Sequence, residues 1–416
     1  MNQSPNESMS QSLSAIAPER TLAELLVLPK VREAFQFFET HAPGITEEHI
    51  AICSIPAPPF GEAARAADLC ERFRSYGLAD AHIDGVGNCV GLRRGRSLSP
   101  LLVVSAHLDT VFPAGTASAV KREGTKLCAP GIADDGCGLA ALVALFRAFG
   151  HTQIETEGSL LFVGTVGEEG EGNLRGARYL LTEGEWAARI DSFVSFDGPG
   201  IERITHAALG SRRYRVRLKG AGGHSWGDFG AANPVHAIGK AIARLAGYPA
   251  PTNPRTTYNV GRISGGSSVN VIPDEASMDV DLRSESADEL RRLDAFFRRA
   301  VQEATEDENA NRRTEHPKLA LDLMLIGDRP SGETPAEAAI VRLAQEATRY
   351  LGFHPRLDRS STDSNIAISL GIPAVTLGAG GTSGNSHTVD EWYDPRGRET
   401  GLKRAMLLML GIVGVQ

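Results

Sequence analysis

The feature that most constrains the fold is an alternation of short apolar runs with a helical segment in the first half of the chain. Residues 101–107, 159–167 and 191–198 are rich in branched and aromatic side chains, and each run ends in polar residues, as buried strands often do. Residues 138–150, between the first two runs, have the composition and length of a helix. We therefore predict an α/β domain in which helices flank a mainly parallel central sheet.

A different pattern begins after Leu209. Residues 211–220, 256–265, 275–284 and 318–327 are expected to be strands, and residues 233–245 and 287–304 carry apolar side chains at helical spacing. The order βαββαβ predicts a ferredoxin-like domain. From Thr334 the first pattern returns, with a helix expected over residues 336–352 and a last helix from about Pro395. We thus expect three parts: a disordered polar leader (1–17), a first domain (18–208 and 329–416) and a domain inserted into it (209–328).

Composition excludes several classes of protein. The 43 basic and 51 acidic side chains leave a formal net charge of −8, which argues against a nucleic-acid partner. No stretch approaches the ~18 apolar residues of a membrane span. The five cysteines are odd in number and lack CxxC spacing, which argues against a disulfide framework or a cysteine-rich zinc site. A cytoplasmic protein is expected.

Polar side chains crowd the carboxyl ends of the predicted strands, where open α/β sheets place their sites. Each alone has an ordinary explanation: Asp134 could cap a helix, Asp197 could serve a turn, and a lone loop histidine is rarely a ligand. Together, so many carboxylates at one sheet edge would repel one another unless cations compensated their charge. The residues concerned are His107, Asp109, Asp134, Asp135, Glu168, Glu169, Asp197 and His387.

Histidine and carboxylate ligands of this kind suit two zinc ions, with cobalt or manganese as substitutes. An aspartate between two metals can bridge them, and such a pair generates hydroxide near neutral pH and polarises a carbonyl. Glu168 and Glu169 are adjacent, so one can bind metal while the other handles the proton. Cys128 and Cys137 are expected to be small buried hydrophobic residues rather than metal ligands.

These segments resemble those of the M20 family of metallopeptidases and deacylases, especially its tripeptide aminopeptidase (peptidase T-like) branch. The resemblance runs in order through most of the chain and rests on further segments at residues 54–62, 84–88, 222–227, 267–276, 361–365 and 386–393. One departure stands out, because many relatives carry lysine shortly after the bridging aspartate, whereas this chain reads Asp135, Gly136 and Cys137. The substrate preference is therefore open.

The resemblance implies a role for each matching residue. It implies that His107 and Asp197 hold one metal, that Glu169 and His387 hold the other, and that Asp134 bridges them. Glu168 is implied as general acid/base, and Asp109 as the group that orients His107. The Asp134–Asp135 peptide bond is expected to be cis.

The inserted domain is implied to act as a lid and to form a homodimer. His224 resembles a histidine that supports the oxyanion, often in the partner subunit's site, and Asn270 and Arg283 resemble groups that face the substrate. Arg283 can be read equally well as a carboxylate anchor or as a strand-surface ion pair.

The function expected is release of the N-terminal residue from di- and tripeptides by metal-bound hydroxide. N-acyl amino acid deacylation and carboxypeptidase activity are the alternatives within the same chemistry. A non-catalytic binding protein and a cysteine hydrolase are alternatives of other classes. The former would lack a ligand or the glutamate base, and the latter would be sensitive to thiol alkylation but not to chelators.

Overall fold

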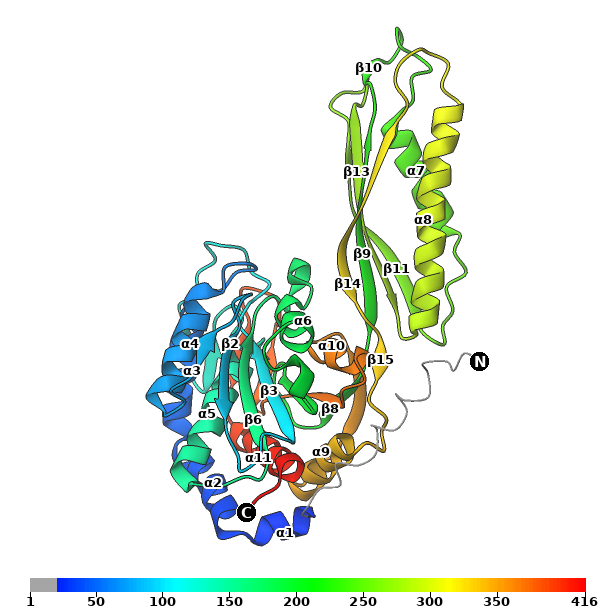
Figure 1. Ribbon diagram of the computed structural model, residues 1–416. Coiled ribbons are helices and arrows are strands. Elements are labelled where there is room, and N and C mark those ends of the chain that lie inside the picture. The colour runs from blue at the N-terminus through cyan, green and yellow to red at the C-terminus, as the bar shows by residue number, and fades with distance from the viewer. Residues whose placement is uncertain (1–20) are drawn as a thin grey trace, which may run out of the picture. The chain divides into compact units, whose positions relative to one another are not determined.

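The structure is a computed structural model that describes residues 21–416 (Figure 1), so the predicted leader lies outside the described residues. The described residues divide into two compact units, residues 21–207 with 333–416 and residues 208–332. Each unit has its own cluster of buried apolar side chains. No helix within the described residues is both long enough and apolar enough to cross a membrane.

The first unit is built on a nine-stranded sheet, and its central strands β6, β3, β7 and β17 run parallel. The three runs expected to be buried strands form β3, β6 and β7, whose residues are all buried. In sheet order the strands are β1 (His82–Ile83), β2 (Cys89–Arg93), β6 (Ser159–Thr165), β3 (Leu101–His107), β7 (Ser192–Phe196), β17 (Ala374–Leu377), β8 (Arg203–Ala208) and β15 (Gly332–Glu333), with β16 (Arg356–Ser360) beside β8.

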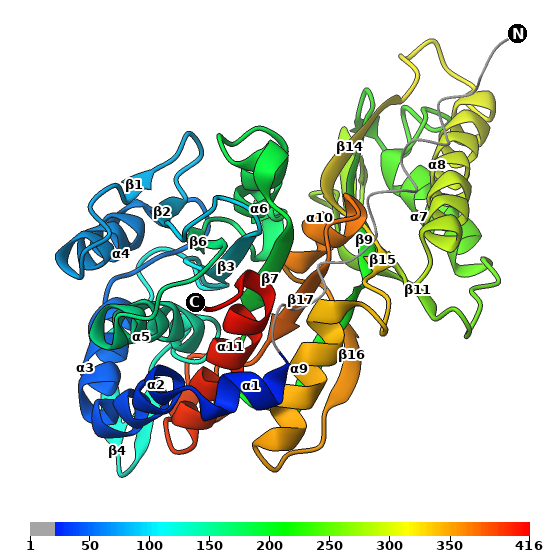
Figure 2. The ribbon, with the colours of Figure 1, turned by 60° about the horizontal axis from the view of Figure 1, so that its bottom comes forward.

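Helices cover both faces of this sheet. The connection from β3 through α5 to β6 moves across the sheet toward β1, and the connection from β6 through α6 to β7 moves toward β17. Because such crossovers are right-handed, α5 and α6 lie on opposite faces of the sheet. Figure 2 shows α6 and α10 on one side of the strands and α5, α9 and α11 on the other. The helices are α1 (Leu22–Val27), α2 (Pro29–Thr40), α3 (Ala42–Cys53), α4 (Ala63–Ser75), α5 (Gly136–Thr152), α6 (Arg175–Thr182), α9 (Ala339–Tyr350), α10 (Ser364–Ser369) and α11 (Arg398–Val413).

A second, four-stranded sheet in this unit was not predicted. Its strands, in order β18 (Thr382–Gly384), β19 (Trp392–Asp394), β5 (Lys126–Cys128) and β4 (Lys121–Glu123), have three residues each. Such short strands show no usable periodicity. Their pairing joins the segment around His387 to the segment before Asp134.

The second unit has the predicted βαββαβ order. Its antiparallel sheet runs β11 (Thr256–Gly265), β13 (Glu275–Ser284), β9 (Gly210–Lys219) and β14 (Ala320–Arg329), and it packs on α7 (Pro234–Ala246) and α8 (Ala287–Ala310). Along β9, Tyr214, Val216 and Leu218 are buried, whereas the arginines between them are only partly buried. A short ladder of β10 (Gly223–His224) and β12 (Val271–Ile272) completes the unit. These observations confirm the predicted fold class.

Candidate metal centre

The predicted site residues of the first unit come from the carboxyl ends of neighbouring parallel strands. His107 is the last residue of β3, Glu168 and Glu169 follow β6, and Asp197 follows β7 directly. Parallel strands end at the same edge of a sheet, so these side chains share one edge. Asp134 and His387 join them from the segment before α5 and from the loop between β18 and β19.

The carboxylate of Asp134 lies between two histidine rings. The Nε2 atom of His107 is 2.9 Å from its Oδ1, and the Nε2 atom of His387 is 3.0 Å from its Oδ2. His387 Nε2 also lies 3.2 Å from Oε1 of Glu169. Three possible ligand atoms, one each from His107, Asp134 and Glu169, lie within 4.8 Å of one another. They are close enough to hold a metal ion.

The ring of His107 is oriented by Asp109, but through the backbone. Its Nδ1 atom is 3.0 Å from the Asp109 carbonyl oxygen and 3.7 Å from Oδ1 of the same residue. A carbonyl oxygen only accepts, so Nδ1 must donate, and the neutral ring then has a lone pair on Nε2. That lone pair faces a carboxylate oxygen of Asp134. This arrangement needs a proton or a cation between them, so the donor set fits a metal ion.

The carboxylate of Asp109 serves a further purpose, because it holds the two glutamates in place. Its Oδ1 accepts the backbone N–H of Glu168 at 3.0 Å, and its Oδ2 accepts the backbone N–H of Glu169 at 2.8 Å. Asp109 is fully buried and the side chain of Glu168 is nearly so. One buried carboxylate thereby fixes the backbone at both glutamates.

The electrostatics of the site reflect closely spaced, poorly hydrated charges. Burial and the neighbouring charge of Asp134 raise the pKa of Asp197 to about 7. Hydrogen bonds to Asp134 and Glu169 raise the pKa of His387 to about 10. Burial alone would raise the pKa of Asp134, but the hydrogen bonds from His107 and His387 lower it below its usual range. The closely spaced carboxylates thus favour a positive charge between them, at the position that a metal cation would occupy.

Two buried carboxylates position the segment around Asp134, and neither was given a role from the sequence. Asp135, not Asp134, caps α5 by accepting the N–H of Gly138 at 3.1 Å. Its other oxygen accepts the N–H of His107 at 3.3 Å. The only sequence feature that could have indicated this positioning role of Asp135 was its place next to Asp134. The peptide bond between the two aspartates is cis, as predicted.

Glu391 is the second positioning carboxylate. Its Oε1 accepts the N–H groups of Ala133 and Asp134 at 2.7 and 3.0 Å, and its Oε2 accepts that of Gly131 at 3.1 Å. Glu391 is fully buried. Its position in the segment 386–393 was the available signal, but its part in the centre depends on the pairing of β19 with β5.

The cysteines lie outside the cluster of metal-binding groups found among the described residues. Cys137 is buried and donates its thiol to the carbonyl oxygen of Ala133 at 3.0 Å, and Cys128 is partly buried.

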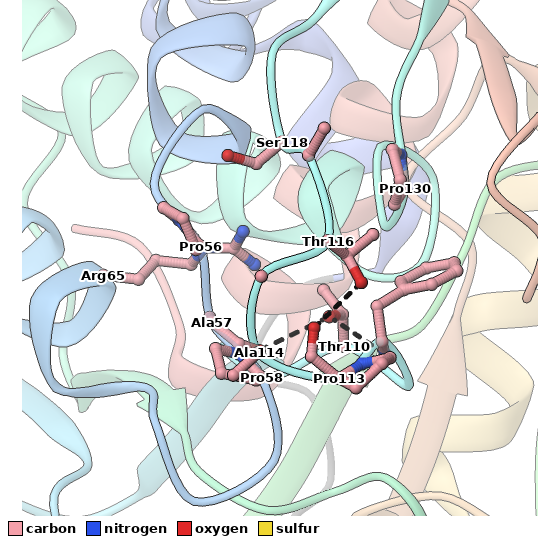
Figure 3. A pocket seen from close by; sticks show the side chains of 13 residues that line it. Pro56, Ala57, Pro58, Arg65, Thr110, Pro113, Ala114, Thr116, Ser118 and Pro130 are labelled. Atoms are coloured by element: carbon pink, nitrogen blue, oxygen red, sulfur yellow. Dashed lines mark hydrogen bonds between the residues drawn. The ribbon is translucent and has the colours of Figure 1, made fainter.

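A pocket of about 110 Å³ adjoins the loop that follows Asp109 (Figure 3). Its wall includes Pro56, Pro58 and Pro113. The N–H of Thr110 in this loop donates a 3.0 Å hydrogen bond to the carbonyl oxygen of Ala57, which also lines the pocket. The buried guanidinium of Arg65 also lines the pocket.

In the second unit the structure brings His224 and Asn270 together but separates Arg283 from them. His224 pairs with Val271 across the β10–β12 ladder, and the carbonyl oxygen of Asn270 accepts the N–H of Ser225 at 3.0 Å. Arg283 lies near the far end of β13, eight residues beyond the first residue of that strand, a separation on the order of 26 Å. Its Nε donates to Asp281 at 2.6 Å, so Arg283 forms an ion pair on the strand surface. Its role in binding a substrate carboxylate stays a prediction.

A histidine and carboxylate centre at the carboxyl edge of a parallel sheet, with an inserted α+β domain, is the arrangement of a hydrolase of the metallopeptidase type. The chain matches the model of peptidase family M20/M25/M40 over residues 103–411, and it belongs to this family. The resemblance drawn from the sequence is thereby confirmed.

The chain is also similar to three individual proteins. The protein YqjE of Bacillus subtilis strain 168 is 26% identical over 356 residues, which cover 81% of this chain and 90% of that protein. The succinyl-diaminopimelate desuccinylase of Herminiimonas arsenicoxydans is 30% identical over 271 residues, 58% of this chain and 67% of the enzyme. The crystal structure of aminopeptidase PepT from Bacillus cereus ATCC 10987 superposes with a TM-score of 0.69 at 20% identity, covering 89% of this chain and 97% of that one.

Proposed function

We propose that this protein uses two divalent metal ions, preferably zinc, to release the N-terminal residue from di- and tripeptides. The observation that carries the proposal is the position of Asp134. One of its carboxylate oxygens faces the ring of His107 and the other faces the ring of His387. A carboxylate shared in this way is suited to bridge two cations.

The proposed ligands follow from that arrangement. His107 and Asp197 would hold one ion, Glu169 and His387 the other, and Asp134 both. When bound, such a pair of ions activates a water molecule and polarises the scissile carbonyl. Cobalt or manganese could replace zinc at a mixed nitrogen and oxygen site.

Glu168 is the proposed general acid/base. It lies next to Glu169, its side chain is buried, and its backbone is fixed by Asp109. It would accept a proton from the attacking water as the new C–O bond forms. It would then deliver that proton to the leaving amine as the amide C–N bond breaks.

The second unit would supply groups that recognise the substrate. We propose that His224 donates a hydrogen bond to the oxyanion of the tetrahedral intermediate and that Asn270 contacts the substrate nearby. Arg283 would bind a substrate carboxylate, for which a guanidinium offers paired donors.

Deacylation of N-acyl amino acids is the second candidate, and the desuccinylase relative is the observation that favours it. That relative matches only 58% of this chain. A carboxypeptidase would share the same centre and differ in which end of the substrate is bound.

The deciding experiment is a substrate panel. Purified protein would be stripped with a chelator, reloaded with zinc, cobalt or manganese, and given tripeptides with a free amine, the same peptides N-acetylated, and N-succinyl amino acids. We expect metal-dependent release of the N-terminal residue from the free-amine peptides only. Cleavage of the acylated compounds alone would establish the deacylase, and release of the C-terminal residue would establish the carboxypeptidase.

We also propose a homodimer formed through residues 208–332 and a cytoplasmic location. In support of the dimer, β11 is an edge strand of its sheet and exposes Ile263. In support of the location, all five cysteines are free thiols. A monomeric mass by light scattering at micromolar concentration, with full activity, would contradict the dimer.

A further inference from the structure

The segment around His224 forms a closed turn. The N–H of Asp228 donates to the carbonyl oxygen of His224 at 2.9 Å, and the N–H of His224 donates to Oδ2 of Asp228 at 2.7 Å. Two reciprocal hydrogen bonds thus connect the first and last residues of the turn. Gly223, which precedes it with φ +150, has its α-carbon against the same carboxylate, and a Cβ there would come within 2.7 Å of Oδ2.

The turn also determines which ring nitrogen of His224 can donate. The backbone N–H groups of Trp226 and Gly227 point at Nδ1 of His224, at 3.2 and 3.3 Å. Backbone N–H groups only donate, so Nδ1 must accept and carries no proton. The neutral ring therefore has its proton on Nε2, the nitrogen left to donate to a ligand.

A second histidine anchors this turn to the rest of the unit. Nε2 of His316 lies 3.1 Å from Oδ1 of Asp228, and since a carboxylate only accepts, His316 is the donor. A backbone hydrogen bond of 2.8 Å from Arg313 to the carbonyl oxygen of Gly230 ties the same two segments together again. Both oxygens of Asp228 are therefore engaged, one by the turn and one by the segment that follows α8.

We infer that Asp228 and His316 are positioning residues that hold His224 with Nε2 as a hydrogen-bond donor toward the substrate. The inference rests on the proposed function, in which His224 supports the oxyanion. Asp228 shapes the turn that presents two amides to Nδ1, and His316 keeps the Asp228 carboxylate in place. Such preorganisation matters most in the transition state, where the oxyanion forms.

The test compares Asp228→Ala, His316→Ala and His316→Gln with the wild type and with His224→Ala. Glutamine can donate an amide N–H to Asp228, whereas alanine cannot. We expect the two alanine variants of the positioning residues to lower kcat by roughly 10-fold or more with little change in KM. His316→Gln should recover most of that loss. His236→Gln is the matched control, because His236 lies on α7 of the same unit and is 66% exposed.

Hydrogen exchange of the full-length protein, followed by mass spectrometry, provides a second measurement that does not depend on activity. The peptide covering residues 222–230 should exchange faster in Asp228→Ala and His316→Ala and return toward wild-type protection in His316→Gln. Wild-type kcat and wild-type exchange in both alanine variants would overturn the inference. If the wild type hydrolyses no amide, the proposed function fails instead, and the exchange data alone decide whether His316 and Asp228 hold the turn.

Discussion

Asp134 and His387 are 253 residues apart in the chain, yet the Nε2 atom of the histidine lies 3.0 Å from Oδ2 of the aspartate. The contact forms because β19, close after His387, pairs with β5, close before Asp134. A small antiparallel sheet thus brings a histidine from near the end of the chain to a carboxylate just before α5. The centre depends on this long-range pairing.

Replacing Glu168 with glutamine should leave metal content nearly unchanged and lower kcat by at least ~10²-fold, because an amide cannot carry the proton. Metal content would be measured by atomic spectroscopy and kcat with the best tripeptide of the panel. Glu183→Gln, on an exposed residue, is the control. Unchanged activity of Glu168→Gln would exclude the assigned role.

Asp109→Asn should weaken metal binding by roughly 10–100-fold, since in the proposed centre this residue organises the ligands rather than binding metal itself. An amide group retains one acceptor and so cannot serve the N–H groups of both Glu168 and Glu169. Competition with a fluorescent chelator gives the affinity, and Asp80→Asn provides an exposed control. Wild-type affinity would show that the carboxylate is dispensable.

Metal removal should destabilise the protein, because cations bound at the proposed centre around Asp134 would favour the folded state. A free metal concentration 100 times Kd adds about 2.7 kcal/mol per site. Thermal melts with and without a chelator measure the effect. Asp134→Ala should lose the response to metal, whereas His236→Gln should keep it. A melting temperature that does not respond to metal in the wild type would contradict the centre.

Glu391→Gln should lower the free energy of unfolding by about 1–3 kcal/mol, the cost of a buried donor that loses its acceptor. Its two oxygens accept three backbone N–H groups, and an amide nitrogen would face at least one of them. Urea denaturation provides the measurement, with Glu202→Gln as an exposed control. Equal stability of the two variants would argue against the positioning role.

Asp394 should make the free energy of unfolding depend on pH in the acidic range. Hydrogen bonds from Arg396, assisted by one from Thr125, lower the pKa of Asp394 to about 2. A carboxyl whose pKa is lower in the folded state stabilises the fold above its ordinary pKa, and this stabilisation is lost as the pH falls through 2.

Asp394→Asn should therefore cost on the order of 1 kcal/mol at pH 7, because solvent screens the exposed arginine. The difference from the wild type should narrow below pH 4. Urea denaturation from pH 7 to pH 3 follows it, and Asp390→Asn is the exposed control. A difference that stays constant across this range would contradict the prediction.

Most of the architecture was predictable, because it depends on local patterns. The buried strands β3, β6 and β7 are short apolar runs, and the second unit combines period-2 strands with amphipathic helices. The sheet of β4, β5, β18 and β19 was missed, since strands of three residues have too few side chains to show a period. Asp134 could have been a helix cap by sequence alone, but the structure assigns that place to Asp135.

The sequence by itself determined the family, the α/β layer with its inserted domain, and a set of histidines and carboxylates at strand ends. Only the tertiary structure decided which groups meet. The rings of His107 and His387 contact Asp134, and the N–H groups of Glu168 and Glu169 donate to Asp109. Glu391 accepts the N–H groups of Gly131, Ala133 and Asp134. The physical reason is that hydrophobic patterns are read within a few residues. Hydrogen bonds between segments hundreds of residues apart depend on how the strands pair and the loops close.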